Sequence, residues 1–191
     1  MKDAIKEEYK QYTIGLALFD LLPVLLFLMS GMVIHSMFGS PVFLAGVVAT
    51  FLGGSCKVLW KLIVVLKHCD VKALTKAFRI LMLGGFGLML LSVVIRGSFA
   101  GPVRGLTMMP AAIFFAVGIA GMCLMGYLGA HMDSSARSNW IEEAVNTLAQ
   151  LAILIGVIMV YLGTYYHAED TALKALESND EVNVTTIEEG Y

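Results

Sequence analysis

Long apolar stretches separated by short polar loops dominate the chain. Five of them can be distinguished: Ile14–Phe38, Val42–Leu66, Phe78–Ile95, Pro110–Leu128 and Trp140–Tyr166. The apolar core of a bilayer is roughly 30 Å thick and takes about 20 residues of helix to cross. Four stretches reach or nearly reach that length, and a helix-compatible lead-in, Val71–Ala77, extends the third. The pattern predicts an all-α polytopic membrane protein, a compact bundle of five transmembrane helices.

The composition supports a chain that is used almost entirely for spanning a bilayer. Hydrophobic residues make up 58% of the 191 residues and charged residues only 15%, which lies outside the usual range for a soluble domain. Residues 1–166 are therefore expected to form one transmembrane domain, with no room for a soluble catalytic or nucleic-acid-binding domain. The first stretch is too long for the apolar core of a signal peptide, and no Ala-x-Ala-like site follows it.

The charged residues predict how the chain is oriented. With five spans, ten of the 13 Lys and Arg fall on the side of the N-terminus and three on the other side. The positive-inside rule then predicts a cytoplasmic N-terminus and an external C-terminus in a multi-pass protein of the cell membrane. The last segment, His167–Tyr191, has seven acids against one Lys and is expected to be a disordered tail.

Ionisable residues inside a span are costly and are candidates for function. Asp20 lies in the first stretch, three residues before Pro23, which is expected to kink the helix. Lys57 lies at a matching depth in the second stretch, so Asp20 and Lys57 are expected to face each other. They are either a neutralising structural pair or a coupled binding site. Lys61, one turn nearer the surface, is expected to snorkel to the headgroups.

A polar face opens the fifth stretch. Asn139 and Glu142 have the spacing of a capping box at a helix start. Four further polar residues fall at i, i+3, i+4 and i+7, on one helix face: Glu143, Asn146, Thr147 and Gln150. This face lies at the depth of Asp20 and Lys57. It predicts either a polar cavity open to the cytoplasm or hydrogen bonding between helices.

Small residues indicate close helix packing. Gly46, Thr50 and Gly54 form a series with a spacing of four in the second stretch, which suits contacts between neighbouring helices in lipid. Packing within one chain is the simpler interpretation, and the seam of a homodimer is the alternative.

The sequence predicts no resident metal or other cofactor. The three cysteines have no paired spacing, and the histidines lack the i, i+4 spacing of a helical metal site. Common nucleophile, zinc and phosphate-binding motifs do not occur in the chain.

Three functions remain open at this stage. The first is a small transporter or binding protein for a polar small molecule, ion or proton, with a site made by the polar residues of the first, second and fifth stretches. The second is a membrane enzyme acting on lipid or isoprenoid substrates. The third is a structural or accessory membrane subunit. Membrane lipids are the expected surroundings in each case, and nucleic acid is not an expected partner.

Overall fold

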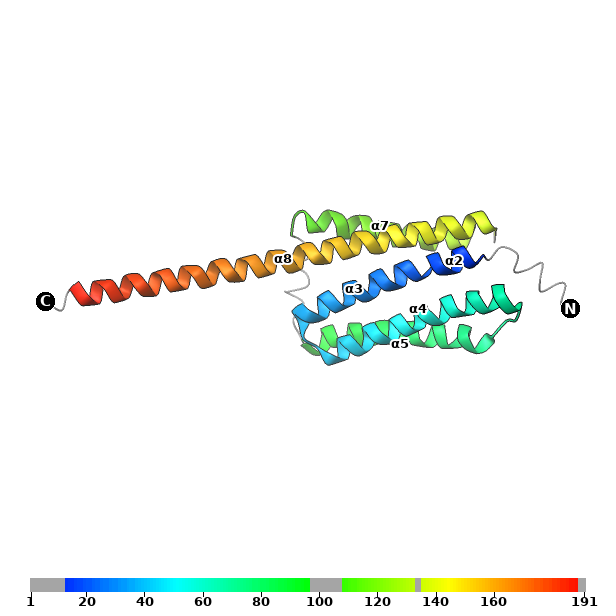
Figure 1. Ribbon diagram of the computed structural model, residues 1–191, viewed down its shortest axis with the longest axis horizontal. Helices are drawn as coiled ribbons and strands as arrows, with labels where there is room; N and C mark the ends of the chain where they lie inside the picture. The colour runs from blue at the N-terminus through cyan, green and yellow to red at the C-terminus, as the bar shows by residue number, and fades with distance from the viewer. Residues whose placement is uncertain (1–12, 97–107, 133–134, 189–191) are drawn as a thin grey trace.

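The computed structural model describes residues 13–96, 108–132 and 135–188. Within these ranges the chain forms helices and no strand, and five of the helical segments are long and apolar enough to cross a membrane. This confirms the all-α class and the number of candidate spans. The two ends of the described chain lie at opposite ends of the molecule (Figure 1).

The first candidate span is broken into two helices. Helix α2 (Ile14–Phe19) begins at Thr13, whose hydroxyl accepts the Leu16 N–H at 3.1 Å, and helix α3 (Leu21–Phe38) follows directly. Asp20 separates them. Pro23 has no N–H to donate to the Phe19 carbonyl one turn earlier, which explains why the helix is interrupted there. The expected proline kink is therefore a break whose centre is Asp20.

Helices α4 (Pro41–Lys67) and α5 (Lys72–Arg96) form an antiparallel hairpin. A Cβ placed on Gly46 of α4 would lie 2.7 Å from the carbonyl oxygen of Gly85 on α5, so the two backbones approach closely at this point. A Cβ on Gly54 would instead meet Val24 of α3 at 2.8 Å. The small-residue series thus packs within the chain, as the simpler interpretation expected.

The second hairpin consists of α7 (Ala111–His131) and α8 (Ala136–Glu188). The predicted capping box at Asn139 is wrong, because α8 begins three residues earlier and the Asn139 N–H already donates to the Ser135 carbonyl. The side chain of Ser135 accepts the Ser138 N–H at 3.2 Å and takes the capping role.

The C-terminal segment also differs from its prediction. Where a disordered tail was expected from residue 167 onward, α8 continues as a helix to Glu188 and projects beyond the other helices (Figure 1). Residues 167–188 contain no Pro or Gly, and they include three Ala, two Leu and four Glu, which are good helix formers.

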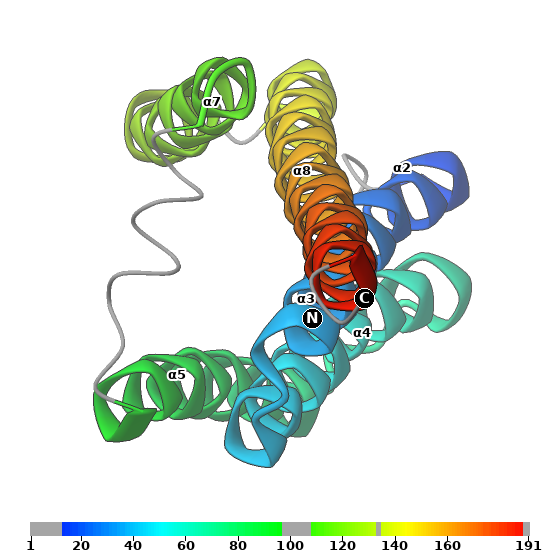
Figure 2. The same ribbon diagram turned by 90° about the vertical axis from the view of Figure 1, so that its left-hand side faces the viewer.

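The five candidate spans lie in a curled row rather than in a closed bundle. The order across the row is α5, α4, the α2–α3 pair, α8 and α7, and each helix packs on its neighbours in this order. Figure 2 shows α5 and α7 apart from each other at the two ends of the row. These edge helices are the least covered. Only 11% of the most apolar window of each is buried, against 39% for α4. Instead of the expected compact bundle, the described helices form an arrangement that is open between α5 and α7.

Candidate functional site

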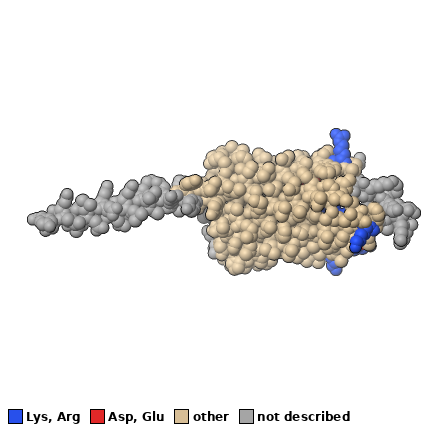
Figure 3. Space-filling view, in the orientation of Figure 1, with Lys and Arg blue, Asp and Glu red and all other residues tan. Residues whose placement is uncertain are grey.

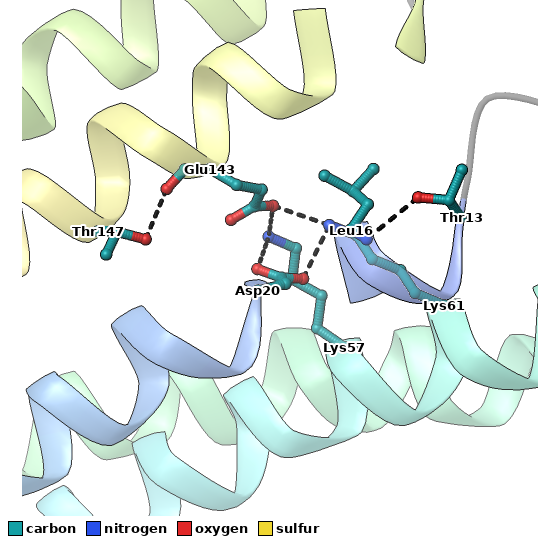
Figure 4. A network of polar contacts seen from close by, with 7 residues as sticks. All are labelled: Thr13, Leu16, Asp20, Lys57, Lys61, Glu143 and Thr147. Atoms are coloured by element: carbon teal, nitrogen blue, oxygen red, sulfur yellow. Dashed lines mark hydrogen bonds and ion pairs between the residues drawn. The ribbon is translucent and has the colours of Figure 1, made fainter. Parts of the chain in front are cut away.

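Four charged side chains from three parts of the chain meet beside the helix break (Figure 4). Asp20 comes from the break, Lys57 and Lys61 from successive turns of α4, and Glu143 from α8. The Asp20 side chain does not cap α3, so its carboxylate is directed to the lysines instead. We refer to these four residues as the charge network.

Lys61 is the buried centre of the charge network. Its Nζ donates to Glu143 Oε1 at 2.7 Å and forms an ion pair with Asp20 Oδ2 at 2.8 Å. Only 5% of its side chain is exposed. The prediction that Lys61 snorkels to the surface is therefore wrong. Its two carboxylate partners hold the ammonium group between the helices.

Lys57 contacts the same two carboxylates from a more open position. Its Nζ donates to Asp20 Oδ1 at 3.2 Å and to Glu143 Oε1 at 3.1 Å. The expected contact between Asp20 and Lys57 is therefore present. About a third of the Lys57 side chain, 34%, is exposed, whereas the side chains of its two partners are almost fully buried.

The charge network is balanced, with two ammonium groups and two carboxylates among the described residues. Removing a charge from water costs several kcal/mol, and a buried ion is tolerated only when it is paired and hydrogen-bonded. Each buried member here contacts two opposite charges. The network therefore ties α4 and α8 together through the break between α2 and α3.

A cavity of about 210 Å³ lies next to the charge network, on the inner side of the curled row. Its polar wall consists of Asp20, Lys57, Thr50, Asn146 and Gln150. The remaining wall is apolar and is made by Pro23, Val24, Phe27, Gly54, Phe78, Met82, Phe86, Met122 and Met125. The site thus combines one polar end with a larger aromatic and thioether surface.

The amides that the sequence singled out on α8 reach this cavity. Asn146 and Gln150 both line it. The Gln150 side chain is close to α7, where its Nε2 lies 3.6 Å from Met122 Sδ. The Asn146 side chain has no hydrogen-bond partner among the described residues. Its amide is therefore free to bind a group inside the cavity.

Two of the predicted site residues have other positions. Thr147 does not line the cavity, and its hydroxyl donates to the Glu143 carbonyl of its own helix at 2.7 Å. A threonine that bonds back to its own helix is satisfied without a partner. Glu143 is also absent from the lining. Its carboxylate lies behind Lys57, so it acts on the cavity through the lysines.

Lys61 is the member of the network that the sequence analysis missed. The signal was its spacing of four residues from Lys57, which places both side chains on one face of α4. A face that carries one intramembrane lysine toward acids should carry the next one toward them as well. Depth alone suggested snorkelling, because Lys61 lies closer to the end of the helix.

No group of three or more His, Cys, Asp or Glu side chains that could hold a metal ion occurs in the described ranges of the chain. The charge network supplies only two carboxylates, and both are already paired with lysines.

Comparisons of this chain with protein-family models, with curated proteins and with solved structures found no match.

Proposed function

We propose that this chain is a multi-pass membrane protein that binds or transports a small molecule carrying a polar group, held in the cavity beside the charge network. The observation that carries the proposal is the position of Lys57. Its side chain is partly exposed on the cavity wall, whereas the side chains of its two acidic partners are almost fully buried, Asp20 on the same wall and Glu143 outside the lining.

The surface of the described helices supports insertion in a membrane. Large apolar side chains are exposed along the outer faces, and Leu83, Leu90 and Ile95 of α5 are 79%, 69% and 66% exposed. Such a surface is unstable in water but suits lipid tails. On the face drawn in Figure 3, uncharged residues cover the middle of the molecule.

The distribution of basic residues supports an orientation in the cell membrane with the N-terminus in the cytoplasm. The Lys and Arg side chains visible in Figure 3 gather at the end of the molecule where α2 begins. Lys67 at the end of α4 and Lys72 at the start of α5 flank the loop between these helices. The basic residues at positions 2, 6, 10 and 104 that entered the prediction lie outside the described residues. This polarity is the one that the positive-inside rule assigns to the cytoplasm.

A purely structural role accounts for only part of the site. It explains the buried ion pairs that Lys61 forms with Asp20 and Glu143. It does not explain a partly exposed Lys57 and an unpartnered Asn146 on the wall of one cavity. Polar groups that converge on an otherwise apolar cavity are typical of a ligand site. The three buried members then serve to hold Lys57 in place at the cavity wall.

Native mass spectrometry of the protein extracted in a mild detergent tests this proposal. The wild type is expected to carry one ligand per protomer. Asn146→Leu is expected to lose it, because this substitution removes the free amide from the cavity wall. Thr147→Val is the matched control, since this neighbouring side chain is directed to its own helix.

Either of two outcomes would overturn the proposal: a wild type without any bound molecule, or a bound molecule that survives Asn146→Leu. The same spectra give the number of protomers. A homodimer whose stability, but not its ligand content, changes in Asn146→Leu would favour the accessory-subunit role instead.

A further inference from the structure

We infer that the ligand is a membrane amphiphile with an uncharged, hydrogen-bond-accepting head, and that it enters the cavity sideways from the bilayer between α5 and α7. This inference rests on the proposed function, because it assigns a chemical class and a route to the ligand of the same cavity.

The route follows from the order of the helices. The cavity is lined by Met82 and Phe86 of α5 and by Met122 and Met125 of α7. These two helices are the ends of the curled row and stand apart (Figure 2). Among the described residues, the row is therefore open between them, on the side that would face lipid. Phe86 lines the cavity and is nevertheless 43% exposed, as expected for a residue at such an opening.

The apolar part of the ligand follows from the lining. Aromatic rings and methionine side chains make most of the wall on α5 and α7. Methionine adapts its shape to irregular apolar surfaces, and lipid tails bind to such walls without a polar partner. A water-soluble metabolite would not cover this apolar wall, whereas the tail of an amphiphile would.

The head group follows from the donors and from the charge balance. An ammonium group has three N–H donors, and Lys57 uses two of them for Asp20 and Glu143. The third N–H has no acceptor among the described residues, and the Asn146 amide lies on the same wall. These groups suit a carbonyl or hydroxyl oxygen. An anionic head would add an uncompensated charge to a network that is already neutral, which is costly away from water.

Two lipids with the same tail test the inference. Delipidated protein in detergent is titrated with monooleoylglycerol, which has an uncharged head, and with oleate, which has an anionic one. Native mass spectrometry then measures how much of each is bound. One monooleoylglycerol per protomer is expected, with an affinity at least roughly tenfold higher than that of oleate, since one uncompensated buried charge costs more than 1.4 kcal/mol. Stronger binding of oleate would overturn the assignment of the head group.

Two tryptophan substitutions on α5 test the route. Met82→Trp fills the cavity and is expected to lower monooleoylglycerol binding at least tenfold, as judged by the same titration. Leu83→Trp is the matched control, because Leu83 is 79% exposed and does not line the cavity. Equal effects of the two substitutions would overturn lateral entry, and gel filtration verifies that both variants remain folded.

The failure of this inference can be separated from the failure of the proposed function. A polar metabolite that copurifies with the wild type and is lost in Asn146→Leu, while monooleoylglycerol does not bind, would refute the amphiphile and leave the binding function in place. A protein that binds neither would refute both. A second copy of the chain at the opening would appear as a dimer that Met82→Trp disrupts, and this result would also overturn the inference.

Discussion

Replacing Lys61 by methionine is the most direct test of the charge network. Methionine is similar in length to the lysine stem, so the packing of α4 is largely kept while one charge disappears. Asp20 and Glu143 are then left with Lys57 alone, which is 34% exposed. One carboxylate charge becomes unbalanced at a position where both acid side chains are at most 7% exposed.

The size of the effect follows from this burial. Removing one partner of a buried ion pair costs about 3–5 kcal/mol, mostly because the remaining charge stays buried without compensation. Lys61→Met is therefore expected to lower the free energy of unfolding by about that amount. The double variant Lys61→Met with Glu143→Gln restores the balance of one lysine against one acid. Its loss in the free energy of unfolding is expected to be about 1–3 kcal/mol smaller than the sum of the losses of the two single variants.

Unfolding by sodium dodecyl sulfate in mixed micelles, followed by circular dichroism, measures these free energies. Lys67→Met is the control, because Lys67 ends the same helix at an exposed position. It is expected to change stability by less than about 0.5 kcal/mol. If Lys61→Met unfolds like Lys67→Met, or if the double variant loses the full sum of the two single losses, the four side chains do not act as one network.

Two further predictions concern packing and capping. Gly46→Ala is expected to destabilise the protein by about 1–3 kcal/mol, because the new Cβ would lie 2.7 Å from the Gly85 carbonyl oxygen. Gly84→Ala, which has open space around its Cβ, is expected to be neutral. Ser135→Ala is expected to cost about 1 kcal/mol through the lost cap of α8, and Asn139→Ala should cost less. The same detergent unfolding experiment checks both pairs, and a reversed order within either pair would contradict the packing or the cap.

The sequence was sufficient to predict the helices because their length and apolarity are set by local composition. The predicted stretch Val42–Leu66 differs from α4 by one residue at each end. The lead-in to the third span is helical as expected, since α5 begins at Lys72. The start of α8 was missed by four residues because Ser135 offers a cap as suitable as the one assumed at Asn139.

The charge network could be predicted only in part. Depth along two antiparallel helices correctly indicated that Asp20 and Lys57 meet, since depth follows directly from residue number. The burial of Lys61 depends on how α4 is rotated and on the distance to α8. Both are fixed by contacts such as that between Gly54 and Val24. The rotation of α4 about its axis cannot be predicted from a single sequence.

The order in which the helices pack could not be predicted from the sequence either. Five apolar segments of similar length can pack as a closed bundle or as a row, and composition favours neither. Close contacts between small residues join neighbours in pairs. A Cβ on Gly121 of α7 would meet that of Ala149 of α8 at 2.8 Å, much as Gly46 meets α5. Because these close contacts join α4 to α5 and α7 to α8, α5 and α7 are left at the edges.

The contacts within each hairpin therefore differ in kind from the contacts between the two hairpins. Each hairpin is held by close backbone contacts. Between the hairpins, α3 packs on both α4 and α8, and the side chains of the charge network add direct ion pairs from α4 to α8. Lys57 belongs both to that link and to the cavity wall. A molecule that binds to Lys57 thus contacts one of the groups that connect the hairpins. We therefore expect ligand binding to alter the contact between α4 and α8, a coupling that transport would require in addition to binding.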